Sequence, residues 1–128
     1  MSYYFSRISP LSFEDTLIKV SEELKKEGFG VLTEIDVKAT LKKKLDVDFR
    51  KYKILGACNP PFAYKALSQE RMIGTMLPCN VIVQEAENNQ TEIAAIDPIS
   101  SMQAVENPVL ADVAAEIQAK LKKVISNI

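Results

Sequence analysis

Strand-like and helical segments alternate along this chain, and their order constrains the fold more than any other feature of the sequence. Short apolar or alternating runs predict five strands, at residues 2–8, 29–36, 52–58, 78–86 and 91–97. Apolar residues at helical spacing predict four helices, at residues 13–27, 37–45, 60–69 and from 108 onward. The order β-α-β-α-β-α-β-β-α predicts an α+β two-layer sandwich, with helices on one face of a mainly antiparallel or mixed sheet.

Capping residues set the predicted ends of the helices. Gly28 is expected to end the first helix, because glycine readily adopts the conformation that follows a helix. Asp36, Asn59 and Asn107 are each expected to cap a helix start, and the two asparagines precede a proline. Residues 72–76 are expected to form a loop or a short strand.

Length and charge narrow the class of protein. A chain of 128 residues fits a single domain spanning 1–128. Sixteen Lys and Arg stand against seventeen Asp and Glu, a balance that argues against a nucleic-acid partner. We expect no membrane span and no signal peptide, because the sequence contains no suitable apolar segment. Two cysteines are too few for a disulfide-stapled scaffold, so we expect a cytoplasmic protein.

The complete absence of histidine restricts the chemistry. It removes Ser–His–Asp and Cys–His catalysis, histidine zinc sites and the usual general base near neutral pH. Any functional site must therefore use thiols, carboxylates and amides. The sequence leaves open whether the protein is an enzyme, and it assigns no cofactor.

Two Cys-Asn dipeptides, Cys58-Asn59 and Cys79-Asn80, are the most suggestive candidates. The first ends a predicted strand before a helix, where the helix dipole lowers the pKa of a thiol. The second begins the next strand, so the two thiols lie close together if the strands are antiparallel neighbours. Alternatively, each cysteine is a small apolar side chain in the core, as free cysteines often are.

Three carboxylates complete the candidate set. Glu34 lies among apolar residues of a predicted strand, so it is either solvated on the open sheet face or paired in a site. Asp36 is either a helix cap or a ligand-binding group. Asp97 precedes Pro98 and is either a turn former or part of the site.

Three functions from different classes remain. Binding of a small ligand or metal ion near Cys58 and Cys79 ranks first, in a cleft that would include Glu34 and Asp97. A structural homodimerisation module without a ligand ranks second, with an aromatic first strand as one candidate surface. A thiol-based redox protein ranks third, because the cysteines are not in a CxxC motif and no base activates them.

Five sequence blocks, in this order, resemble the domain of unknown function 302 family. They are Gly28–Val37, Tyr52–Pro60, Leu77–Val81, Ile96–Pro98 and Asn107–Pro108. The resemblance covers nearly the whole chain. It implies a small α+β domain that forms homodimers, and it assigns no activity. It marks Glu34, Asp36, Cys58, Asn59, Cys79, Asn80 and Asp97 as family positions without assigning roles to them.

Overall fold

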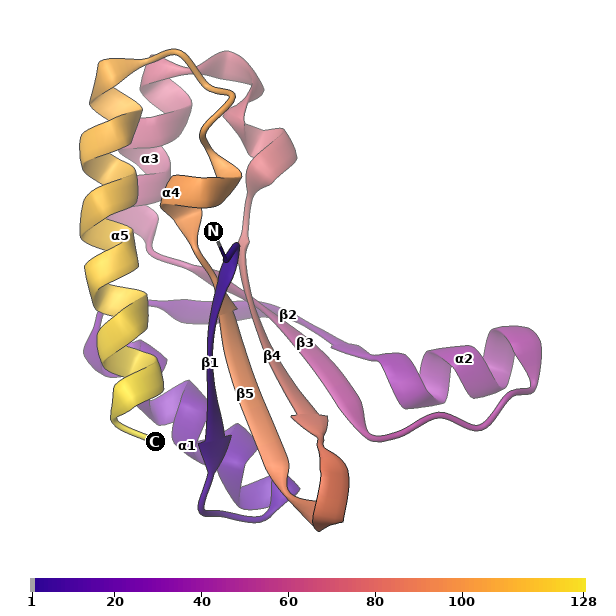
Figure 1. The fold of residues 1–128 in the computed structure, drawn as a ribbon. Helices are drawn as coiled ribbons and strands as arrows, with labels where there is room; N and C mark the ends of the chain where they lie inside the picture. Colours follow the sequence, from indigo (N-terminus) through magenta and orange to yellow (C-terminus); the bar gives the residue numbers. More distant parts are fainter. Residues whose placement is uncertain (1) are drawn as a thin grey trace.

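The structure is a computed structural model that describes residues 2–128. It contains five strands and a set of α- and 3₁₀-helices (Figure 1). In chain order these are β1 (Tyr4–Ser9), α1 (Phe13–Lys26), β2 (Gly30–Asp36), α2 (Val37–Leu45), β3 (Tyr52–Cys58), α3 (Pro60–Gln69), η1 (Arg71–Met76), β4 (Cys79–Glu85), η2 (Glu87–Asn89), β5 (Thr91–Ile96), α4 (Pro98–Ser101) and α5 (Pro108–Ser126).

The five strands form one antiparallel sheet in the order β1-β5-β4-β3-β2. The predicted α+β class is confirmed. β4 and β5 pair as an antiparallel hairpin. β3 and β4 are antiparallel neighbours with Ala57 opposite Cys79, so the end of β3 lies beside the start of β4.

Helices α1, α3 and α5 lie on one side of the sheet, and the main core fills the space between them and the strands (Figure 1). The core takes alternate residues of the central strands, such as Val81, Val83 and Ile93. The helices add residues at helical spacing, such as Val20 and Leu121. Among residues 2–128, no helix combines the length and apolar character needed to cross a lipid bilayer.

The predicted caps are observed with one exception. Gly28 follows α1 with a φ of 87°, and Asp36 accepts a hydrogen bond from the backbone of Ala39 at 2.9 Å. Asn107 caps α5 through the backbone N–H of Val109. Asn59 occupies the N-cap position of α3, but its side chain makes no capping bond, so that prediction is wrong.

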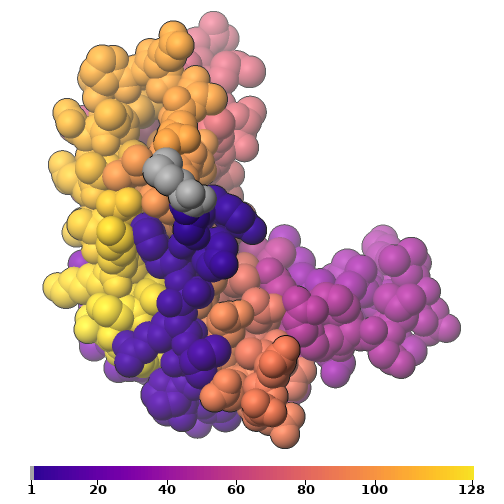
Figure 2. Space-filling view, in the orientation of Figure 1, coloured from indigo at the N-terminus to yellow at the C-terminus, as the bar shows by residue number. Residues whose placement is uncertain are grey.

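Two short helices and one projection were not expected. Residues 71–76 form a 3₁₀-helix rather than a loop or strand, and α4 follows β5 directly. Helix α2 has no buried residue, and it projects away from the rest of the molecule (Figures 1 and 2). We call residues 37–51, which comprise α2 and its connection to β3, the arm.

Candidate functional site

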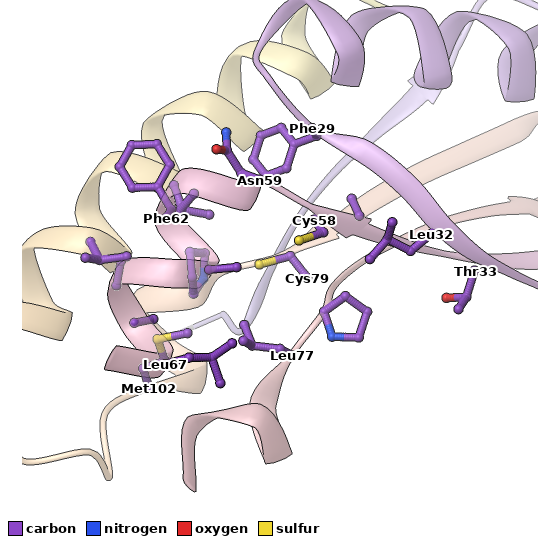
Figure 3. A pocket seen from close by; sticks show the side chains of 18 residues that line it. Phe29, Leu32, Thr33, Cys58, Asn59, Phe62, Leu67, Leu77, Cys79 and Met102 are labelled. Carbon is purple, nitrogen blue, oxygen red and sulfur yellow. The ribbon is translucent and has the colours of Figure 1, made fainter. Parts of the chain in front are cut away.

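An apolar cavity of about 300 Å³ opens between one end of the sheet and the helices. We call it the thiol pocket, because both cysteines lie in its wall (Figure 3). Its lining residues come from β3, α3, α5 and the segments around β2, η1, β4 and α4. They are Phe29, Leu32, Thr33, Ala57, Cys58, Asn59, Phe62, Ala63, Ala66, Leu67, Leu77, Pro78, Cys79, Pro98, Met102, Val113, Ala114 and Ile117.

The strand register brings the two cysteines together. Cys58 is the last residue of β3, and Cys79 is the first residue of β4. Because Ala57 lies opposite Cys79, the two cysteines are diagonal neighbours across the ladder. Both are free thiols and both are half-buried. Figure 3 shows their side chains directed into the same cavity.

The environment of Cys79 disfavours its thiolate. Burial, with a smaller contribution from the neighbouring Cys58, raises the pKa of the Cys79 thiol to about 11. This thiol is therefore protonated at neutral pH. A nucleophilic or redox-active cysteine would instead need a lowered pKa.

Asn59 is a buried structural residue at the edge of the pocket. Its amide donates a 3.1 Å hydrogen bond to the carbonyl of Glu27, at the end of α1. The amide nitrogen lies 3.1 Å from an ideal Cβ built on Gly28, so the α1–β2 turn passes close by. Asn59 thus ties the start of α3 to the end of α1.

The pocket offers a ligand little polarity or charge. Among residues 2–128, no charged side chain lines it. Within the same part of the chain, every buried side-chain nitrogen and oxygen already has a hydrogen-bond partner. A polar ligand would therefore find few unpaired groups here, whereas apolar walls favour an apolar one.

Asn80 and Glu34 lie outside the pocket. Asn80 is exposed and lines a second pocket, of about 380 Å³, together with Tyr52 and Ile82. Glu34 is exposed on β2 and forms a 3.0 Å ion pair with Lys53. An exposed pair of this kind contributes little to stability.

Two candidate carboxylates are helix caps. Asp36 caps α2, and Asp97 caps α4 by accepting from the backbone N–H of Ile99 at 3.0 Å. Asp97 also accepts a 3.1 Å bond from the side chain of Gln118 on α5. The structure therefore brings Cys58, Asn59 and Cys79 to the pocket, and it leaves Glu34, Asp36, Asn80 and Asp97 out of its wall.

Within residues 2–128, no cluster of side chains suits Zn²⁺, Mg²⁺ or Ca²⁺. Across residues 2–128, no three His, Cys, Asp or Glu side chains gather in a way that could hold an ion. A tetrahedral zinc site or an oxygen-rich site for Mg²⁺ or Ca²⁺ needs more such ligands than this.

Sequence reasoning missed the apolar part of the pocket. Phe29, Phe62 and Leu67 supply much of its wall, yet their spacing resembles that of ordinary core residues. No sequence signal separates an apolar side chain that fills a core from one that borders a cavity.

Comparison with known proteins shows which family the chain belongs to. Residues 5–128 match the family described as Domain of unknown function DUF302. The chain belongs to the DUF302 family. A crystal structure of an uncharacterized conserved DUF302 protein from Bacillus stearothermophilus is similar to this DUF302 domain, with a TM-score of 0.91 and 30% sequence identity. The similarity covers 98% of both chains. A search of curated proteins finds no match.

Proposed function

We propose that this DUF302 domain binds a small, neutral, apolar molecule in the thiol pocket. One observation carries the proposal. The protein has a cavity of about 300 Å³ whose wall is almost entirely apolar, and no side chain of the chain fills it. Apolar side chains around an open cavity of this size stay in contact with solvent, unlike those of a close-packed core. A cavity kept open at the junction of sheet and helices therefore favours a ligand site.

The volume and the wall define the ligand class. Since one water molecule occupies roughly 30 Å³ of liquid volume, a cavity of about 300 Å³ has room for a small molecule of about ten non-hydrogen atoms. The absence of charged lining residues, among residues 2–128, favours a neutral molecule, because a charge here would lose its hydration without a partner. The protonated thiol of Cys79 adds to this neutral surface.

Thermal unfolding with and without naphthalene, a neutral hydrocarbon of suitable size, tests the proposal. Naphthalene should raise the melting temperature in a concentration-dependent manner, because it binds only the folded state. In Ala63→Phe the added ring occupies the cavity, so the naphthalene effect should disappear. Ala115→Phe, on the exposed side of α5, is the matched control and should keep the effect. Equal responses from both variants would contradict the proposal.

We expect the protein to work in the cytoplasm. A reducing compartment keeps cysteines as thiols, and both cysteines here are free.

A second function, self-association, is supported by the arm. α2 has nine residues and none is buried, although isolated helices this short are marginal in water. Ile35, Leu45 and Val47, on and beside the arm, are 47%, 66% and 43% exposed. Every residue of the neighbouring edge strand β2 is also exposed, and such strands readily pair with another chain.

Charge favours a second copy of the chain as the partner. Of the sixteen basic and seventeen acidic residues in the chain, the arm holds six and two. They are Lys38, Lys42, Lys43, Lys44, Arg50 and Lys51, against Asp46 and Asp48. The remainder of the chain is therefore acidic and complements the arm of a second copy.

Light scattering tests this second function. The wild type should have the mass of a dimer, and Leu45→Asp should be monomeric because it places a charge in the apolar part of the arm. Tyr64→Asp is the control: Tyr64 is 76% exposed on α3, a helix that lies far from the arm in Figure 1, so this variant should stay dimeric. A monomeric wild type at high protein concentration would contradict self-association.

A further inference from the structure

The thiols of Cys58 and Cys79 can bind a soft metal ion, a property that plays no part in binding an apolar ligand. Cys58 and Cys79 face one cavity from the ends of adjacent strands, and the wall contains a third sulfur at Met102 (Figure 3). Soft sulfur ligands select soft ions, whereas Mg²⁺ and Ca²⁺ prefer oxygen. Both thiols are free to act as ligands.

The number of available ligands narrows the choice of metal ion further. Beside the two thiols, the described part of the chain places no His, Asp or Glu that could complete a group of three. Zn²⁺ requires four ligands of this kind in a structural site. Cu(I) is satisfied by two or three sulfur ligands, so the ligand set of the pocket suits Cu(I) better than Zn²⁺.

We propose that Cys58 and Cys79 bind a single Cu(I) ion in the thiol pocket. Each thiol that becomes a ligand releases its proton to solvent as the copper–sulfur bond forms. The ion enters and stays as Cu(I), so no electron is transferred. Two thiolates and one Cu(I) ion carry a net charge of −1, so the ion offsets half of the charge that the two thiols gain when they lose their protons. This inference rests on the proposed ligand site, because it uses the same cavity.

Anaerobic competition for Cu(I) against the chelator bathocuproine disulfonate tests the inference. The wild type should retain one Cu(I) per chain, and Cys58→Ser and Cys79→Ser should each lose at least tenfold in affinity, as expected when a sulfur ligand is removed. Met72→Leu removes a sulfur outside the pocket, at a residue that is 69% exposed, so this variant should bind Cu(I) as the wild type does. Zn²⁺ should not compete.

Loss of Cu(I) from the wild type as easily as from the Cys58→Ser/Cys79→Ser double variant would overturn the inference, as would equal affinity for Zn²⁺. Naphthalene binding separates this failure from failure of the proposed function. Cys58→Ser should still respond to naphthalene in thermal unfolding. If naphthalene binds and Cu(I) does not, only the copper site is wrong; if Cu(I) binds and naphthalene does not, only the apolar-ligand proposal is wrong.

Discussion

Gly56, in β3, has no room for a side chain. An ideal Cβ at this position would lie 2.2 Å from Oγ1 of Thr33 and 2.8 Å from Cγ of Pro78. Gly56→Ala should therefore lower the free energy of unfolding by about 1–3 kcal/mol, since neighbouring groups must move. Gly30→Ala is the control, because an added Cβ there meets nothing within 4 Å. If urea unfolding shows that Gly56→Ala and Gly30→Ala lower the free energy of unfolding equally, this account is contradicted.

Cys79 should titrate far above an ordinary thiol. The pKa of about 11 follows mainly from burial, so alkylation by iodoacetamide in a Cys58→Ser variant should still accelerate well above pH 9. A rate that levels off near pH 8.5, the ordinary value, would contradict the buried environment.

The same titration affects stability. Because the folded-state pKa of Cys79 lies above its unfolded value, the contribution of the thiol is complete below about pH 8.5. It is lost as the pH rises towards 11. Between about pH 8.5 and 11, the free energy of unfolding of Cys79→Ala should therefore fall less than that of the wild type.

Two capped helices should respond differently to loss of the cap. Asp97 is buried and joins α4 to Gln118 on α5, so Asp97→Ala should cost about 1–3 kcal/mol and leave an amide without its partner. Asp36 caps α2, which has no buried residue, so Asp36→Ala should loosen the arm with little effect on global unfolding. Hydrogen exchange of the α2 amides, beside a urea titration, measures both effects. An equal loss of global stability in both variants would contradict the independence of the arm.

Most elements could be predicted because their signals are local. The apolar pattern of the sequence predicted β3, and the proline after Asn59 predicted the start of α3. Both elements lie where they were predicted, at Tyr52–Cys58 and Pro60–Gln69. α4 was missed because four residues contain too little periodicity to indicate a helix. The side chain of Asn59 was assigned to a cap because sequence indicates the position of a residue but not its tertiary partner, which here is the carbonyl of Glu27.

At the scale of the whole molecule, only the thiol part of the site was accessible from sequence. The proximity of Cys58 and Cys79 followed from one assumption about strand pairing, and the register bears that assumption out. The cavity itself depends on how α3, α4 and α5 sit over the sheet end, which no local pattern determines. The projection of the arm could likewise not be predicted, because it follows from the fact that α2 buries none of its residues against the rest of the chain.

NMR of the methionine methyl groups tests the apolar-ligand proposal most directly. Met102 lines the thiol pocket, whereas Met72 is 69% exposed on η1 and lies outside the lining. Titration with naphthalene should shift the methyl signal of Met102 to saturation and leave that of Met72 unchanged, and Ala63→Phe should abolish the shift. An unmoved Met102 signal, or equal shifts at both methionines, would contradict binding in the thiol pocket.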